Sequence, residues 1–264
     1  MNATLFDAHC HLHHEPIAAR WPSVWNEMQQ VGWGGAIVNG TDTGDWNDVA
    51  TFAEQHDWAT PAFGVHPWRI DHVHDDWLEA LRGHLTRFPG ALVGEIGLDR
   101  VRKGFDRDRQ EAMFSEQFAL AAKLDRPCCV HCVQAHGRLV ELIESVDRPT
   151  RWIMHGYSGS AEMVERFIRL GAYLSFGPAT LGRAKVVEAL RATPPDRVLM
   201  ETDAPYMPAD ESMSRFEIPG RGKARWSHPA NLIVAYETAA DRLGLAVADL
   251  TDQVAANAKQ LTGR

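Results

Sequence analysis

Histidines are concentrated in one short segment near the N-terminus, FDAHCHLHH, which runs from residue 6 to residue 14 and holds four histidines and one aspartate. Side chains of an extended strand alternate between two faces, so His9 and His11 project to the same side and could bind one metal ion together. A lone histidine at a strand end is more often an ordinary polar residue, but an i, i+2 pair is less easily dismissed. His13 and His14 follow the expected end of the strand, and we interpret them as loop residues that at most support the ligands.

Other residues that can bind metals stand where later apolar runs end. They are His66 in FGVHP, Glu95 in VGEIGLD, His131 in CCVHC, His155 in IMHGYSG and Asp203 in METDAP. One such residue is usually a hydrogen-bonded core group, but so many titratable side chains would be costly to bury without shared compensation. Four imidazoles and two carboxylates suit divalent ions such as Zn²⁺ or Mn²⁺, with Mg²⁺ as a further candidate, and two ions bridged by one carboxylate would use every ligand. The sequence therefore predicts a site for two divalent metal ions.

Short apolar runs alternate with amphipathic stretches along the whole chain, and this order positions the candidate ligands. Eight runs predict strands, and they begin at Thr4, Gly34, Thr60, Ala91, Pro127, Arg151, Ala172 and Val198. Helical patterns between them cover residues 106–124, 135–145, 161–170 and 183–191. The alternation predicts an α/β fold, a (β/α)8 TIM barrel, in which the carboxyl ends of all strands meet at one face. An open doubly wound sheet is the rival, but no G-x-G-x-x-G motif follows the first strand.

Length and composition set the frame for this barrel. The 264 residues contain no Ser/Gly linker, so we predict a single domain over residues 1–264. Lys and Arg number 27 against 35 Asp and Glu, so any polyanion would have to be held locally rather than by a global field. Neither a signal peptide pattern nor an apolar span of roughly 18 residues is present, and we predict a cytoplasmic protein without a membrane partner. Nothing in the sequence indicates an obligate protein partner.

The spacing of Cys129 and Cys132 could indicate a zinc or redox pair. Positions 129 and 132 of a strand face opposite sides, however, and cysteine is among the most buried residue types. We therefore interpret these cysteines as core residues, and the absence of a disulfide framework suggests a reducing compartment.

In combination and order, six motifs resemble those of the TatD family of metal-dependent deoxyribonucleases. They are HCHL from His9, GVHP from Gly64, GEIGLD from Gly94, HC from His131, HGYSG from His155 and ETDAP from Glu201, and they span nearly the whole chain. The resemblance implies a TIM barrel that hydrolyses phosphodiester bonds, as an exodeoxyribonuclease acting on DNA ends or short single strands. It also implies the role of each ligand: one ion on His9 and His11, the other on His131 and His155, with Glu95 as the bridge and Asp203 holding or orienting the attacking water. Glu95 and Asp203 are thus the expected catalytic residues.

Several positions depart from the family's pattern. After the fifth-strand histidine the family commonly reads Arg-Asp-Ala, where this chain has Val133, Gln134 and Ala135. An arginine at position 133 could clamp a phosphate, whereas a valine cannot. The family also often has Asp where His13 stands, and Asn or Glu where His228 stands.

Three further residues are predicted to bind substrate: His66, Arg100 and Arg225. His66 would face the substrate phosphate, although a structural role before Pro67 is an equal alternative. The two arginines belong to basic runs after the fourth and eighth strands, which offer phosphate contacts. These runs contain Arg100, Arg102, Lys103, Arg107, Arg109, Arg215, Arg221, Lys223 and Arg225. Solvated charged loops are the alternative reading of both runs.

Two other functions stay open at this point. The same dimetal site could hydrolyse a lactone, an amide or a small phosphoester. The reason for this interpretation is Val133, which stands where the family commonly has an arginine. A catalytically inactive homologue would bind metal without turnover, although all the expected ligands are present.

Overall fold

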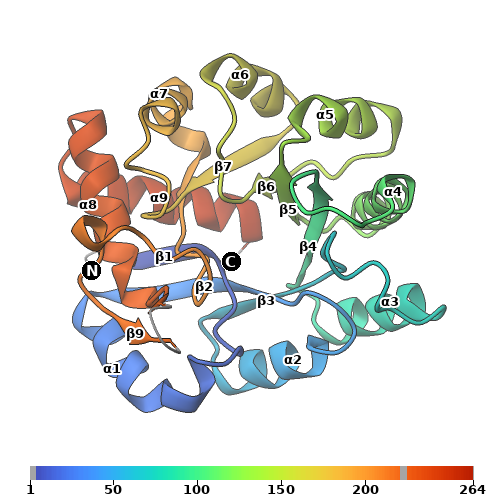
Figure 1. Ribbon diagram of the computed structural model, residues 1–264, viewed down its shortest axis with the longest axis horizontal. Coiled ribbons are helices and arrows are strands. Elements are labelled where there is room, and N and C mark those ends of the chain that lie inside the picture. The colour runs from blue at the N-terminus through green and yellow to red at the C-terminus, as the bar shows by residue number, and fades with distance from the viewer. Residues whose placement is uncertain (1–3, 221–224, 264) are drawn as a thin grey trace.

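The computed structural model describes residues 4–220 and 225–263, and its centre is a sheet of eight parallel strands. The strands are β1 (Leu5–Cys10), β2 (Trp33–Asn39), β3 (Ala59–Phe63), β4 (Leu92–Asp99), β5 (Cys128–Val133), β6 (Trp152–Met154), β7 (Ala172–Phe176) and β8 (Val198–Met200). Each strand pairs with the next one along the chain. The two edges approach after β1 and β8, where His11 N–H donates to the Ala204 carbonyl at 2.7 Å and Asp203 N–H donates to the His9 carbonyl at 2.9 Å. The predicted (β/α)8 barrel is confirmed (Figure 1).

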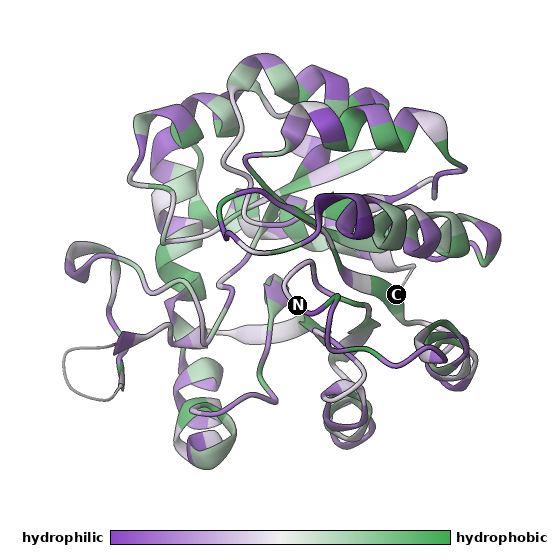
Figure 2. Ribbon diagram, turned by 45° about the vertical axis from the view of Figure 1, so that its right-hand side comes forward, coloured by the Kyte–Doolittle hydropathy of each residue, from purple (hydrophilic) through white to green (hydrophobic). Residues whose placement is uncertain are grey.

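Helices surround this barrel and cover its outer face (Figure 1). They are α1 (Trp21–Gln30), α2 (Trp46–Gln55), α3 (Trp77–Arg87), α4 (Arg107–Lys123), α5 (His136–Ser145), α6 (Ala161–Arg169), α7 (Ala184–Ala192), α8 (Leu232–Leu243) and α9 (Val247–Thr262). The four helical patterns in the sequence correspond to α4, α5, α6 and α7, with ends within a residue of the expected ones. Figure 2 shows hydrophilic and hydrophobic residues mixed along these outer helices, as expected for helices with one face on the core and one in water.

Burial on both faces explains why the strands could be recognised. Every residue of β3, β4, β6, β7 and β8 is buried. Because helices cover the outside and side chains fill the inside, parallel strands of this kind read as continuous apolar runs.

Three strands end earlier than their apolar runs, and this decides where the site lies. β3, β6 and β8 stop before His66, His155 and Asp203, so these three side chains stand on loops beyond the carboxyl ends of the strands. Backbone hydrogen bonds hold the loops in place: His66 N–H donates to the Thr41 carbonyl at 2.8 Å, and His155 N–H to the Val130 carbonyl at 3.0 Å. The loops are therefore anchored on neighbouring units of the barrel.

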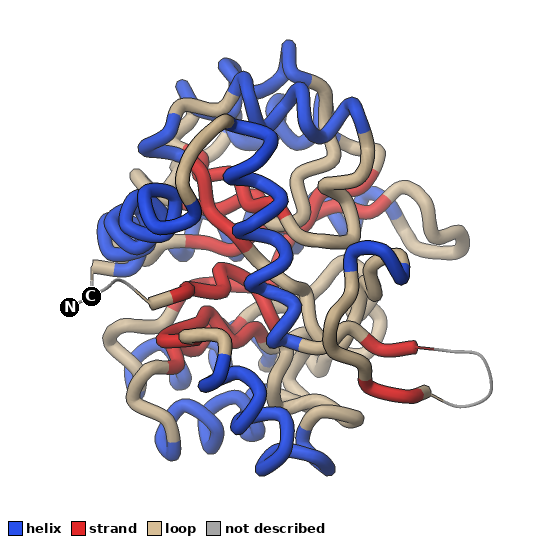
Figure 3. The backbone as a smooth tube through the Cα atoms, turned by 90° about the vertical axis from the view of Figure 1, so that its left-hand side faces the viewer, coloured by secondary structure: helices blue, strands red, loops and turns tan. Residues whose placement is uncertain are grey.

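A small addition to the barrel was not predicted. β9 (Ile218–Pro219) and β10 (Arg225–Trp226) form an antiparallel pair that projects from the body of the molecule (Figure 3). Arg221 and Lys223 of the expected basic run lie outside the described residues. Short 3-10 helices occupy Ala18–Arg20, Pro195–Arg197, Glu211–Met213 and Pro229–Asn231. Among the described residues, we find no helix whose length and hydropathy would let it span a bilayer.

Candidate metal centre

Glu95, in β4, lies at the centre of the expected ligands and is only 3% exposed. Its Oε2 atom is 3.4 Å from Nε2 of both His9 and His11. Its Oε1 atom is 3.1 Å from Nδ1 of His131 and 2.9 Å from Nε2 of His155. Each carboxylate oxygen thus faces a different pair of imidazoles, which is the arrangement required of a carboxylate that bridges two cations.

Asp203 lies over the first of these pairs. Its Oδ1 atom is 3.5 Å from Nε2 of both His9 and His11. The backbone at Asp203 has a φ of 54°, in the left-handed region that aspartate tolerates better than most residues. The loop after β8 therefore turns so that the carboxylate comes back over the end of β1.

Hydrogen bonds determine which nitrogen of His11 and which nitrogen of His131 faces the site. Nδ1 of His11 donates to the carbonyl of Asn39 at 2.7 Å, so Nε2 presents its lone pair to Glu95 when the ring is neutral. On the other side, Nε2 of His131 donates to Oδ2 of Asp99 at 3.1 Å, and Nδ1 faces inward. Partners of this kind orient metal-binding histidines and set their tautomer. The donor set and its orientation therefore fit a pair of borderline divalent ions.

The pKa values of these groups show that the cluster favours positive charge. Burial lowers the pKa of His11, but hydrogen bonds to Asp203 and Glu95 outweigh it and raise the pKa to about 9. His131 follows the same pattern, because burial is outweighed by the hydrogen bonds to Asp99 and Glu95, and its pKa rises to about 9. Conversely, burial would raise the pKa of Glu95, yet the surrounding histidines hold it well below its usual range. Bound cations would supply the positive charge in place of protons.

His66 reaches the same carboxylate but is arranged differently. Its Nδ1 accepts from the backbone N–H of Trp68 at 3.1 Å, so Nε2 carries the proton and lies 3.3 Å from Oε1 of Glu95. Burial lowers the pKa of His66 to about 4, so the ring is neutral near pH 7. Although His66, Glu95 and His131 are close enough to share an ion, this tautomer makes His66 a hydrogen-bond donor toward the site rather than a ligand.

Three buried residues contact the expected ligands, and sequence reasoning gave none of them a role in the site. One is Asp99. The second is Cys129, whose Sγ atom is 3.1 Å from Nδ1 of His9, and all four cysteines are free and buried. The third is Glu201, whose Oε1 atom is 3.9 Å from Nδ1 of His155 and which also accepts from the Ser175 hydroxyl. Asp99 and Cys129 each share a strand with an expected ligand, four and two positions away, so strand alternation was the signal that could have found them. Glu201 follows the end of β8, where alternation gives no such signal.

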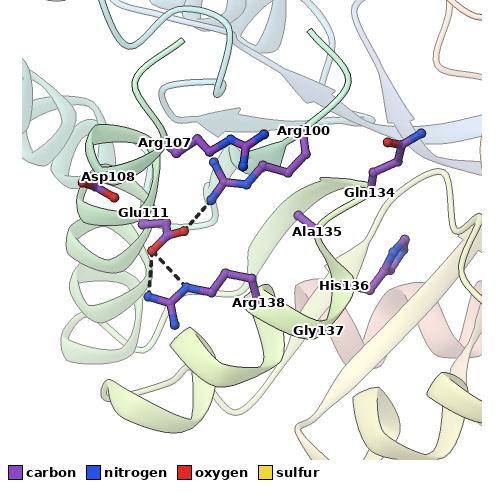
Figure 4. A pocket seen from close by; sticks show the side chains of 9 residues that line it. All are labelled: Arg100, Arg107, Asp108, Glu111, Gln134, Ala135, His136, Gly137 and Arg138. Atoms are coloured by element: carbon purple, nitrogen blue, oxygen red, sulfur yellow. Dashed lines mark hydrogen bonds and ion pairs between the residues drawn. The ribbon is translucent and has the colours of Figure 1, made fainter. Parts of the chain in front are cut away.

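Arg100 directly follows β4, and its guanidinium is paired within the chain. Its Nη2 atom pairs with Glu111, and the other oxygen of Glu111 accepts from Nη2 and Nε of Arg138 at 2.7 and 3.0 Å. Figure 4 shows these side chains on the wall of a cleft of about 540 Å³ between the start of α4 and the start of α5. Arg100 thus shares the single carboxylate of Glu111 with Arg138.

Arg225, in β10, also has partners within its own region. Nη2 donates to the carbonyl of Ala209 at 3.4 Å, and Nη1 lies 3.8 Å from Oε1 of Glu211. Neither contact involves an expected metal ligand.

A closed parallel barrel with a carboxylate between two pairs of histidines defines a metal-dependent hydrolase. A family model described as TatD related DNase matches residues 6–263, and the chain belongs to this family. The chain is 33% identical over 212 residues to the uncharacterized metal-dependent hydrolase YjjV of Escherichia coli (strain K12), covering 79% of this chain and 82% of that protein. It is 28% identical over 265 residues to the 3'-5' ssDNA/RNA exonuclease TatD of Pantoea ananatis, covering 98% and 99%. The crystal structure of the TatD homolog YjjV from Escherichia coli superposes with a TM-score of 0.90 at 26% identity over 100% of both chains. The predicted family is confirmed, and the protein is a TatD-family metal-dependent hydrolase.

Proposed function

We propose that this hydrolase is a phosphodiesterase that uses two divalent ions to remove nucleotides from the 3′ end of single-stranded DNA or RNA. The position of Glu95, with each oxygen facing a separate imidazole pair, is the observation that carries the proposal. The polarity and the substrate are suggested by relatives named 3'-5' ssDNA/RNA exonuclease TatD, from Pantoea ananatis and Klebsiella pneumoniae.

In this proposal the six converging side chains divide between two ions. His9 and His11 would hold one ion with Asp203, His131 and His155 would hold the other, and Glu95 would contact both. When bound, two such ions lower the pKa of a water between them and stabilise charge on the attacking and leaving oxygens. Zn²⁺, Mn²⁺ and Mg²⁺ are the candidates.

Asp203 and His66 act directly on the reactants. Burial raises the pKa of Asp203, but hydrogen bonds from His11 and His9 hold it well below its usual range, so the carboxylate is ionised and accepts the proton of the attacking water. His66 carries its proton on Nε2 and donates it in a hydrogen bond to a phosphate oxygen.

Two half-exposed aromatic rings at the mouth suit single-stranded substrates. Trp68 and Tyr206 are each 38% exposed. The ring of Trp68 is 6.3 Å from that of His131, and the ring of Tyr206 is 5.4 Å from that of His11, so one stands beside each imidazole pair. Stacking of a base on such a ring contributes about 1–3 kcal/mol and is available to unpaired nucleotides of any sequence.

A small-molecule hydrolase is the second candidate, and Val133 together with the pairing of Arg100 favours it. At the end of β5, Val133 offers no positive charge and Arg100 is paired with Glu111, so neither of these two residues supplies a free cation for a second phosphate. Lactones or p-nitrophenyl phosphodiesters would then be the preferred substrates.

The deciding experiment uses chelator-stripped protein with 3′-labelled and 5′-labelled single-stranded oligonucleotides, adding Mg²⁺, Mn²⁺ and Zn²⁺ back separately. We expect metal-dependent release of the 3′ label as a mononucleotide, and a ladder of shorter products from the 5′-labelled strand. A protein that binds at least two equivalents of metal but shortens neither strand would overturn the nuclease, and lactone and p-nitrophenyl assays would then test the second candidate.

A further inference from the structure

A second group of metal-binding side chains lies next to the Glu95 cluster. It consists of His13 and His14, in the loop after β1, and Asp45, which directly precedes α2. Their ligand atoms all lie within 4.8 Å of one another. Nε2 of His14 is 3.1 Å, and Nε2 of His13 is 3.6 Å, from Oδ2 of Asp45. Ligands about 2.0–2.1 Å from a tetrahedral zinc ion stand roughly 3.3 Å apart, so these atoms lie near the positions that one ion would require.

His13 is the residue that points to a ligand. Its side chain is 3% exposed, yet within the described part of the chain neither Nδ1 nor Nε2 has a hydrogen-bond partner. Leaving a buried polar group unpaired costs about 1–3 kcal/mol, and native structures rarely do so without a reason. A cation between His13 and Asp45 would satisfy Nε2.

The other two side chains are already held in position. Oδ2 of Asp45 accepts from the backbone N–H and the hydroxyl of Thr41 at 2.8 and 2.7 Å. Nδ1 of His14 contacts the hydroxyl of Tyr206 at 3.0 Å, which leaves Nε2 directed at Asp45. Hydrogen bonds of this type orient ligands in metal sites, and here they come from the loops after β2 and β8.

We propose that His13, His14 and Asp45 form a third cation site, separate from the centre bridged by Glu95, which takes one borderline divalent ion such as Zn²⁺. Two imidazole nitrogens and one carboxylate oxygen favour such an ion over Mg²⁺ or Ca²⁺, which prefer oxygen ligands. The ring of His14 stacks on that of His11, with centroids 5.3 Å apart and planes at 6°, so the site lies at the mouth beside the first imidazole pair. Three protein ligands leave the fourth position of a tetrahedral ion open.

Metal content tests the site without reference to activity. The full chain is loaded with excess Zn²⁺, desalted and analysed for zinc per chain, and His14→Ala and His13→Leu are compared with wild type. We expect each variant to hold one equivalent less. His72→Ala, which removes an exposed histidine, is the matched control and keeps the wild-type content.

The Glu95→Gln background separates this site from the dimetal centre. The single variant should retain the third ion, and adding His14→Ala should remove it, as seen by zinc content and by loss of the visible absorption of bound Co²⁺. Circular dichroism verifies that each variant is folded. If folded Glu95→Gln and its His14→Ala derivative bind equal zinc, or if folded His14→Ala and His13→Leu hold the wild-type content, the third site does not exist, whatever the substrate of the enzyme.

Discussion

Glu95 is the side chain on which both halves of the proposed two-ion centre depend. Glu95→Gln keeps the volume of the side chain but replaces one carboxylate oxygen by an NH2 group. The side chain can then no longer bridge two cations through its two oxygens. We expect loss of at least one ion and a fall in kcat of about 100-fold or more, since metal and bound water act together. Metal analysis and single-turnover kinetics would measure both effects. Glu116→Gln, on the exposed side of α4, is the control, and normal turnover in Glu95→Gln would remove the two-metal proposal.

Asp99 controls the tautomer of His131. Its Oδ1 accepts from the backbone N–H groups of Val101 and Arg102 at 2.8 and 3.1 Å, while Oδ2 faces Nε2 of His131. In Asp99→Asn the amide oxygen would keep the backbone contacts, and the NH2 group would turn toward His131. The proton of the ring would then move to Nδ1, which no longer offers a lone pair to the metal.

We therefore expect Asp99→Asn to lower the affinity for the second ion by about 10–100-fold. A titration of turnover against free metal concentration should show a shifted midpoint with a restored maximum. An unshifted midpoint would mean that His131 binds no ion through Nδ1.

At the scale of elements, the backbone of β4 lies close to that of β5 at Gly97. This glycine has a φ of 147°, and a Cβ atom there would stand 1.9 Å from the carbonyl oxygen of His131. The methyl group of Gly97→Ala would push β5 away next to His131, an expected ligand. We expect the free energy of unfolding to fall by about 2–5 kcal/mol through backbone strain and overpacking.

Urea unfolding of the metal-free protein would measure the effect of Gly97→Ala. Gly83→Ala, in α3, is the control, because its Cβ atom meets nothing within 4 Å and alanine should stabilise the helix by about 0.5–1 kcal/mol. Equal stability of the two variants would contradict the close approach of the strands.

The strands of the barrel were predicted from their mostly buried apolar runs, and α4 to α7 from their amphipathic patterns. The runs at Thr60, Arg151 and Val198 continue past the ends of their strands, because the loops that follow are also packed against the barrel. In these three runs only backbone pairing with a neighbouring strand distinguishes strand from loop. That pairing depends on the neighbouring strand as well as on the run itself. The β9–β10 hairpin was not predicted because each of its strands has only two residues, too few to show a period.

At the scale of the whole molecule, barrel closure explains what could be foreseen of the site. Polar residues at the ends of parallel strands must converge at one face, so the meeting of His9, Glu95 and Asp203 followed from the strand order. The contact of His14 with Asp45 did not follow, since 31 residues separate them and neither lies in a strand. The pairing of Arg100 with Glu111 could not be predicted either. It depends on where the loop after β4 meets α4, and strand alternation does not describe that contact.

The proposed metal centre should also hold the barrel together, because its expected ligands come from β1 and the loop after it, β4, β5 and the loops after β6 and β8. An ion that binds only the folded chain stabilises it by about 4 kcal/mol per site when its free concentration is 1,000 times Kd. We expect chelator-stripped protein to melt several degrees lower, and added ion to restore the Tm. In Glu95→Gln, most of this metal-dependent rise in Tm should be lost. A wild-type Tm that does not change with metal would contradict the prediction.

The charge balance of the molecule limits how it can hold a nucleic acid. The net charge is −8, and several arginines are paired within the chain, among them Arg100 with Glu111 and Arg215 with Glu237. Few phosphates can therefore be neutralised at once. Each phosphate contact to a single strand contributes about −0.7 to the slope of log affinity against log salt, so a protein with two contacts has a slope near −1.4.

For a short single-stranded oligonucleotide, we expect log kcat/KM plotted against log salt concentration to have a slope of about −1 to −2. The measurement covers about 50 to 200 mM salt at a fixed concentration of free metal. Val133→Arg should add one contact at the end of β5 and steepen the slope by about 0.7 with a lower KM, whereas Val133→Gln, similar in polarity but uncharged, should not. A slope of about −5 or steeper in the wild type would mean that the protein wraps a long polyanion, which the charge of this chain argues against.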